Sequence, residues 1–176
     1  MKHTEPRISP FSLIHPFTPG VTPAKPLSEA VLWFIFQNDQ LLIEQKTEEK
    51  ISLGSTSPLA HGLSPIFSQY IGSYNGTDVF VAELPGSVEV PETMRFMNLR
   101  ALFGKIDKDF FSLAGRAIQI IQWNRDHKYC GRCGTAMLIR QTELAKKCPA
   151  CSFISFPRLS PAVIMSIIRG KEILLA

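Results

Sequence analysis

The chain has 176 residues, a formal net charge of +4, 45% apolar residues and 19% charged residues. This apolar fraction is too high for a disordered chain, and the length suits one compact domain with an appendage, or two small domains. The longest uninterrupted apolar run, Ala30 to Phe36, is far shorter than the roughly 20 residues of a membrane helix. The N-terminus lacks the basic start and apolar core of a signal peptide, so we expect a cytoplasmic protein with no membrane partner.

The first 27 residues contain six of the 13 prolines. Because proline lacks an N–H group and fixes its own backbone, helices and central strands are disfavoured there. We therefore expect a proline-rich arm over residues 1–27, extended or poorly ordered, with the folded part beginning at Glu29.

The segments that follow the arm indicate β-structure. Ala30 to Phe36 is short, apolar and rich in aromatic and β-branched residues, as is typical of a buried strand. Asn75-Gly76 is a strong hairpin signal between two further strands. The expected strands are residues 30–36, 41–44, 70–74 and 78–84, and the expected loops are residues 46–50, 52–65 and 85–90.

Two helices are expected after these strands. Pro91, at a position where its missing N–H does no harm, opens a predicted helix over residues 91–102. Asp107 can cap a longer helix over residues 108–126, in which apolar residues recur at three- and four-residue spacing and define a face that packs on the core. That face consists of Phe110, Phe111, Leu113, Ala114, Ala117, Ile118 and Ile121. The sequence therefore predicts a small α+β domain over residues 28–126.

All the cysteines lie in two Cys-x-x-Cys pairs separated by 14 residues. They are Cys130, Cys133, Cys148 and Cys151. Each pair places two thiolates on one side of a tight loop, and zinc prefers four such ligands in a tetrahedron. Gly131 and Gly134 allow the backbone angles that such loops need. The spacing predicts a structural Zn²⁺ site in a ribbon over residues 127–157, with no coordination position open to water.

Other interpretations of the cysteines are weaker. Ordinary buried thiols or a redox pair would not require the doubled spacing, and clustered thiols indicate a reducing compartment more than a disulfide framework. Iron could occupy the same ligand set. His127 lies close by, but a fifth ligand is not needed, so we expect it to be a surface or packing residue. The other histidines, His3, His15 and His61, form no constellation in the sequence.

The segments around the cysteines resemble a known family. An aromatic-Pro-Arg-x-x-Pro stretch begins at Phe156, and apolar segments over residues 162–168 and 173–176 predict a hairpin. A helix leads into the first cysteine pair, and Thr142-Glu143 stands before the second pair. Together with the aromatic-Pro-Arg-x-x-Pro stretch, these features resemble the NADH pyrophosphatases of the Nudix superfamily. The resemblance covers about residues 100–176 and is looser before them. It implies an α+β fold: an N-terminal domain, a zinc ribbon, and the first strands of an incomplete Nudix domain over residues 158–176.

The resemblance also implies a function. Members of the family hydrolyse NADH or NAD⁺ to nicotinamide mononucleotide and AMP, bacterial members also remove NAD caps from RNA, and they are typically homodimers. Their Nudix domain binds Mg²⁺ or Mn²⁺ through glutamates in the pattern G-x5-E-x7-R-E-x-x-E-E-x-G, and these ions polarise the pyrophosphate. That pattern does not occur in these 176 residues. We therefore expect a shortened chain with no catalytic residues of its own and no pyrophosphatase activity by itself.

Three substrate-binding residues are carried over from the resemblance. Arg100 resembles an arginine near the substrate, and a guanidinium suits a pyrophosphate; the alternative is a surface arginine with no ligand. Glu143 matches a ribbon glutamate that contacts the nucleotide, against the alternative of a solvated hairpin charge. Phe156 stands where the family often has Tyr, so it can stack on a base but lacks a hydroxyl to donate; the alternative is simple packing.

The predicted ribbon and the residue that follows it are rich in basic side chains. They are Lys128, Arg132, Arg140, Lys146, Lys147 and Arg158. Ribbons that bind nucleic acid have a similar composition, although a solvated positive face explains it as well. The leading hypothesis is the N-terminal and ribbon part of an NAD(H) diphosphatase. The alternative is a non-catalytic ribbon module that binds nucleic acid or a protein partner.

Overall fold

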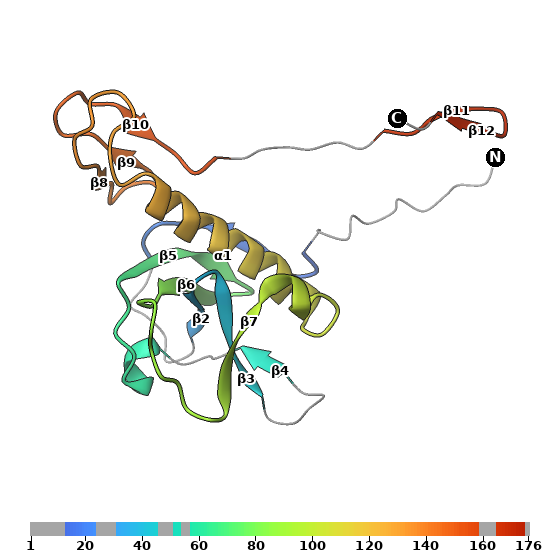
Figure 1. Ribbon diagram of the computed structural model, residues 1–176, viewed down its shortest axis with the longest axis horizontal. Coiled ribbons are helices and arrows are strands. Elements are labelled where there is room, and N and C mark those ends of the chain that lie inside the picture. The colour runs from blue at the N-terminus through green and yellow to red at the C-terminus, as the bar shows by residue number, and fades with distance from the viewer. Residues whose placement is uncertain (1–12, 24–30, 46–50, 54–56, 159–164, 175–176) are drawn as a thin grey trace.

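A computed structural model describes residues 13–23, 31–45, 51–53, 57–158 and 165–174. It has one α-helix, which crosses a seven-stranded sheet, and a small ribbon that lies beyond the C-terminal end of that helix (Figure 1). The strands are β1 (Phe17–Pro19), β2 (Val31–Gln37), β3 (Gln40–Gln45), β4 (Ile51–Leu53), β5 (Phe67–Tyr74), β6 (Thr77–Glu83), β7 (Met94–Asn98), β8 (Leu138–Ile139), β9 (Lys146–Lys147), β10 (Ile154–Ser155), β11 (Ile167–Arg169) and β12 (Glu172–Leu174). The helices are α1 (Lys108–Asp126) and the 3₁₀ turns η1 (Pro58–His61) and η2 (Leu99–Leu102).

The large sheet is mixed, with strand order β1-β5-β6-β2-β3-β4 and with β7 paired to β3. Strands β2 and β6 run parallel, and the other pairs in this sheet are antiparallel. The hairpin predicted around Asn75-Gly76 is confirmed, since Tyr74 pairs with Thr77 across that turn. The first two predicted strands are also confirmed, as β2 and β3.

Apolar side chains cover both faces of this sheet. On one face, Phe34, Phe36 and Leu41 pack against α1 in the larger core. On the other face, Ile35 and Leu42 belong to a second apolar cluster, with side chains from the loops. Because neighbouring residues of a strand point to opposite faces, covering both faces explains why β2 is a nearly continuous apolar run.

Helix α1 has the predicted bounds and the predicted cap. The carboxylate of Asp107 accepts hydrogen bonds from the N–H groups of Asp109 and Phe110 at 2.8 and 3.2 Å. Four residues of the predicted apolar face are buried, and Phe110 and Ile118 are partly buried against the same core. Phe111 instead packs edge-to-face on Phe103.

The helix predicted over residues 91–102 is wrong. Residues 94–98 form β7, which pairs antiparallel with β3, and only Leu99–Leu102 coil, as a 3₁₀ turn. Phe96 and Met97, paired with Leu42 and Leu41, contribute to the second cluster and the larger core respectively. Phe96 and Met97 thus point to opposite faces of the sheet, which is the two-residue period of a strand. Pairing with β3 outweighs the helix-start signal of Pro91.

The proline-rich arm is partly folded, so the expectation that the folded part begins at Glu29 is wrong. Its residues 17–19 form β1, which pairs with β5 at the sheet edge. Gly72 of β5 has φ +139°, and a Cβ there would lie 2.3 Å from the carbonyl oxygen of Thr18 and 2.8 Å from the Phe17 ring. Only glycine admits this approach. Residues 1–12 and 24–27 of the arm lie outside the described residues.

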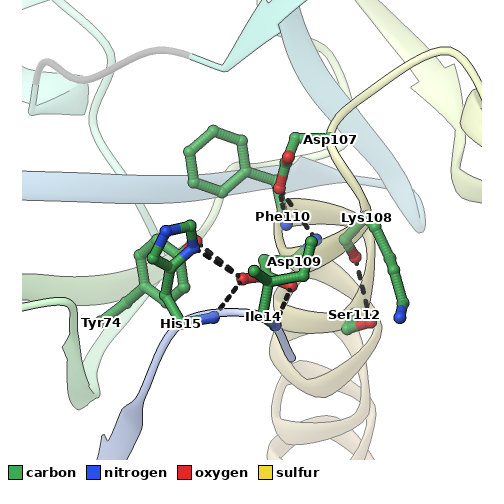
Figure 2. Close-up of polar contacts among 8 residues, drawn as sticks. All are labelled: Ile14, His15, Tyr74, Asp107, Lys108, Asp109, Phe110 and Ser112. Carbon is green, nitrogen blue, oxygen red and sulfur yellow. Dashed lines mark hydrogen bonds and ion pairs between the residues drawn. The ribbon is translucent and has the colours of Figure 1, made fainter. Parts of the chain in front are cut away.

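A buried carboxylate joins the arm to the first turn of α1 (Figure 2). Asp109 has a side chain only 1% exposed. Its Oδ1 accepts the N–H of Ile14 at 2.7 Å, and its Oδ2 accepts the N–H of His15 and the hydroxyl of Tyr74, each at 2.9 Å. The Nδ1 atom of His15 lies 3.2 Å from the same Oδ2 and 3.0 Å from the Tyr74 hydroxyl. His15 therefore does belong to a polar cluster, which no pattern in the sequence predicts.

These contacts shift the pKa values of Asp109 and Tyr74 in opposite directions. Burial alone would raise the pKa of Asp109, but the hydrogen bonds from Ile14, His15 and Tyr74 stabilise the carboxylate and lower the pKa to about 2. Burial and the bond to Asp109 raise the pKa of Tyr74 to about 12.

Two ion pairs of Arg125 connect the C-terminal end of α1 to the sheet. An NH₂ group of Arg125 donates to Asp39 Oδ1 at 2.7 Å, and its Nε lies 3.0 Å from Glu83 Oε1, as an ion pair without an aligned hydrogen bond. Asp39 sits in the β2–β3 turn, and Glu83, at the end of β6, is 7% exposed. These pairs fix the C-terminal half of α1 to the sheet.

Two smaller sheets follow α1. Strands β8, β9 and β10 form an antiparallel sheet with β9 in the centre, and β11 pairs with β12 as a hairpin. The hairpin predicted over residues 162–168 and 173–176 is present in its described part, and residues 162–164 and 175–176 lie outside that part. The predicted loop over residues 46–50 also lies outside it, and the predicted loop over residues 52–65 includes the end of β4 and η1. None of the helices in the described ranges has the length and apolar composition to cross a membrane.

Candidate metal centre

The two cysteine pairs have matching backbone turns. In the first turn, the N–H of Cys130 donates to Thr135 O and the N–H of Gly134 donates to Cys130 O, both at 2.8 Å. In the second, the N–H of Cys148 donates to Phe153 O at 2.8 Å and the N–H of Ser152 donates to Cys148 O at 3.0 Å. The two turns therefore have the same pattern of backbone hydrogen bonds, and the first follows α1 while the second follows β9.

The residue after each pair has a left-handed backbone. Gly134 has φ +75° and Ser152 has φ +60°. The expectation for Gly134 is thus confirmed, whereas Gly131 is not among the glycines with positive φ. Serine at position 152 holds a conformation that glycine adopts at lower cost.

The four sulfur atoms converge on one point. Sγ of Cys133 lies 3.4 Å from that of Cys148 and 3.5 Å from that of Cys151, and Sγ of Cys130 lies 3.6 Å from that of Cys151. A tetrahedral zinc ion with Zn–S bonds of about 2.3 Å needs sulfur atoms about 3.8 Å apart. Among the described residues, these cysteines are the one group of three or more Cys, His, Asp or Glu ligand atoms that gather in this way. The donor set fits a structural Zn²⁺ ion.

Hydrogen bonds lower the pKa of two of the four thiols, Cys133 and Cys130. The side chain and N–H of Thr135 lower the pKa of Cys133 to about 6. Burial acts to raise the pKa of Cys130, but the N–H groups of Arg132 and Cys133 lower it. The N–H of Phe153 acts to lower the pKa of Cys151, yet burial and the other three sulfur atoms raise it to about 12. Four thiolates in one cage repel one another, so a bound cation is required for all of them to lose their protons.

His127 is not part of the cluster. Its Nδ1 atom lies 3.0 Å from the carbonyl oxygen of Trp123, where it can donate a hydrogen bond within the last turn of α1. Its ring packs at a tilt on the Trp123 ring, with centroids 6.1 Å apart. This placement agrees with the expectation of a packing histidine.

The ribbon is joined to the larger domain by Leu144 and Lys146, two residues that lead into the second cysteine pair. Leu144 packs against the core between α1 and the sheet. Lys146 is only 4% exposed, and its Nζ donates to Asn124 O at 2.6 Å and to His127 O at 3.1 Å. The sequence predicts for Lys146 either a contact to nucleic acid or a solvated charge, and it does not predict this role. The available signal was the strand alternation of Lys146 and Lys147, which places one of the two lysines inward.

The predicted substrate residues fall into two groups. Glu143 lies in the β8–β9 turn and forms an ion pair with Arg140. Phe156, 52% exposed, follows Ser155, the register partner of Lys146, so it lies at the same end of the ribbon sheet as that turn. Arg100 is exposed in η2, which precedes α1, whereas the ribbon follows α1. A helix of 19 residues is about 28 Å long, so Arg100 is not brought together with Glu143 and Phe156 in this chain.

The chain matches two family models. Residues 31–123 match the NADH pyrophosphatase-like rudimentary NUDIX domain, and residues 125–156 match the NADH pyrophosphatase zinc ribbon domain. The first match alone covers more than half of the chain.

The chain belongs to the NADH pyrophosphatase family. Strands β2 to β7 and most of α1, within residues 31–123, thus make up the family's rudimentary Nudix domain, and the four cysteines form the zinc site of its ribbon. Both the α+β fold and the resemblance seen in the sequence are confirmed.

Curated relatives carry the name NAD-capped RNA hydrolase NudC. The protein of Stutzerimonas stutzeri is 42% identical over 113 residues, which is 64% of this chain and 41% of the relative. That of Deinococcus radiodurans is 32% identical over 145 residues, or 82% of this chain and 48% of the relative, and that of Pseudomonas aeruginosa is 38% identical over 113 residues, or 64% and 40%. The chain therefore spans less than half the length of these relatives.

Proposed function

We propose that this chain is the rudimentary Nudix domain and zinc ribbon of an enzyme that hydrolyses the pyrophosphate bond of NADH, NAD⁺ or NAD-capped RNA. The products from the free dinucleotide are nicotinamide mononucleotide and AMP. The observation that carries the proposal is the direct connection, through α1, of the family's rudimentary Nudix domain to a four-cysteine cage. The name of these relatives, NAD-capped RNA hydrolase, supports the capped-RNA substrate.

We propose Glu143 and Phe156 as contacts to the nucleotide. Phe156 has the exposed ring that stacking on a base requires, and Glu143 offers a carboxylate to a ribose hydroxyl or a base amine. The Arg140 ion pair orients that carboxylate. Arg100, exposed and apart from them, would contact the pyrophosphate in a homodimer, in which a second subunit can supply the missing side of the site.

Catalysis would need residues other than these 176. The family's glutamate pattern, which holds Mg²⁺ or Mn²⁺, does not occur in these 176 residues. The ribbon would contribute nucleotide contacts and a rigid support, with Zn²⁺ in a structural role because four thiolates fill its coordination positions. Free clustered thiols suit the reducing cytoplasm.

The alternative of a nucleic-acid-binding ribbon module is less well supported than the sequence suggested. Of the six basic residues in and next to the ribbon, Lys146 is buried on α1 and Arg140 is paired with Glu143. Arg132 lies over the Phe153 ring, 5.2 Å from its centroid. Fewer cations therefore remain for phosphates than composition alone indicates.

A chimera tests the proposal. Residues 1–176 joined to the C-terminal half of the Deinococcus radiodurans relative should hydrolyse NADH and release the cap of NAD-capped RNA. Replacing Glu143 with Gln or Phe156 with Ala should lower kcat/KM by about tenfold or more, as expected for losing one good contact. A folded, zinc-loaded chimera without hydrolysis of either substrate would contradict the proposal.

A further inference from the structure

Lys146 occupies an unusual position for a lysine. It lies in β9, the central strand of the ribbon sheet, two residues before Cys148 of the metal site. Its side chain is almost fully buried, while that of the next residue, Lys147, is exposed. A lysine is rarely buried unless its ammonium group has partners.

The partners of Lys146 are at the C-terminal end of α1. Its Nζ donates to the carbonyl oxygens of Asn124 and His127, at 2.6 and 3.1 Å, and lies 5.5 Å from the centroid of the Trp123 ring. Carbonyl groups in the last turn of a helix have no N–H donor within the helix, and the end of the helix dipole favours a positive charge. Lys146 thus caps α1 from a strand that is 20 residues further along the chain.

Strand β9 keeps its place only while the ribbon is folded. It is two residues long and pairs with two strands of the same length. Such short strands cannot form a stable sheet by themselves, so the metal site has to hold them together. The cap on α1 therefore depends on the metal through the position of Lys146.

We propose that Lys146 is a positioning residue that couples the zinc-bound ribbon to the last turn of α1. With zinc in the cage, β9 holds the ammonium on the end of the helix, and without zinc that turn loses its cap. Leu144 adds an apolar contact to the larger core. If the proposed function holds, the coupling also keeps Glu143 and Phe156 in place relative to the rudimentary Nudix domain.

Amide hydrogen exchange on the zinc-loaded 176-residue chain tests this coupling without any nucleotide, so its outcome is independent of the proposed function. The variant Lys146→Met keeps the volume of the side chain and removes the ammonium. The matched control is Lys147→Met, the exposed neighbour in the same strand. Zinc content is measured for each protein, and exchange is followed at residues 124–128 and at residues 109–113.

In zinc-loaded Lys146→Met, exchange at residues 124–128 should be at least about tenfold faster than in the wild type. Exchange at residues 109–113 should be unchanged, and Lys147→Met should match the wild type at both places. Equal exchange at residues 124–128 in zinc-loaded Lys146→Met and wild type would overturn the proposal.

Chelation of zinc from the wild type gives a second measurement, which decides the matter if Lys146→Met fails to hold zinc. Removing the metal should speed exchange at residues 124–128 by a similar factor and leave residues 109–113 protected. Unchanged protection at residues 124–128 after complete removal of zinc would also overturn the proposal.

Discussion

The hydroxyl of Tyr74 donates a 2.9 Å hydrogen bond to Asp109, a carboxylate buried in the first turn of α1. Because the same carboxylate accepts the N–H groups of Ile14 and His15, it joins the β5–β6 hairpin, the N-terminal arm and the helix at one point (Figure 2). Removing any one of these partners leaves the buried carboxylate with fewer hydrogen bonds, which lowers the stability of the fold.

Replacing Asp109 with Asn should destabilise the protein by about 2–3 kcal/mol, since the amide lacks the charge and turns an acceptor into a donor that faces other donors. Tyr74→Phe, which removes one donor and keeps the ring, should cost about 1 kcal/mol. Urea unfolding followed by circular dichroism measures both values. Equal stability of Asp109→Asn and wild type would show that the cluster does not support the fold.

The same cluster gives a pH dependence. The folded pKa of Asp109, about 2, lies below its ordinary value of 3.8, so the carboxylate stabilises the fold above pH 3.8, and this stability is lost as the pH falls towards 2. Tyr74 is shifted the other way, from 10.0 to about 12, so its stabilising effect is present below pH 10 and is lost as the pH rises through 12. The stability difference between wild type and Asp109→Asn should therefore shrink between pH 4 and pH 2. The zinc site is equally sensitive to acid in both proteins, so its effect cancels in this difference. A constant difference between pH 4 and pH 2 would contradict the lowered pKa of Asp109.

The two cysteine turns provide a matched pair of backbone tests. Ser152→Gly should stabilise the ribbon by about 1 kcal/mol, because φ +60° is unfavourable for serine. Gly134→Ala should destabilise it by about 1–2 kcal/mol through the backbone alone, since a Cβ at Gly134 would meet no atom within 4 Å. Competition for zinc with a chelator of known affinity measures both changes. The same sign of effect in the two variants would contradict the equivalence of the turns.

Removing a buried zinc ligand should release the metal. Cys130→Ser and Cys148→Ser each replace a buried thiolate with a hydroxyl, and metal binding in such ribbons is coupled to folding. Both variants should contain well under one zinc per chain after gel filtration, with loss of amide protection across residues 129–155. Stoichiometric zinc in either variant would show that zinc binding does not depend on that cysteine.

Much of the fold follows from local patterns in the sequence. The bounds of α1 were predictable because Asp107 is a capping residue and the apolar spacing matches a helix, and the cysteine turns were predictable because their spacing is tied to zinc geometry. These features depend on residues close together in the chain. They need no knowledge of the tertiary partners.

The features that were missed depend on distant partners. Met94–Asn98 forms a strand because β3 lies beside it, which the helix-start signal at Pro91 did not reveal. The roles of Asp109 and Lys146 arise from backbone groups 95 and 22 residues away in the chain. A single charged residue gives no local sign that it will be buried with such partners.

The four-thiolate zinc site supports the ribbon, the family assignment and the coupling to α1 alike. X-ray absorption at the zinc edge, with metal analysis of the purified chain, tests it most directly. We predict one zinc per chain with four sulfur ligands at about 2.3 Å and no nitrogen or oxygen ligand. A sub-stoichiometric metal content, or a nitrogen ligand in place of one sulfur, would contradict the arrangement of Cys130, Cys133, Cys148 and Cys151 described above.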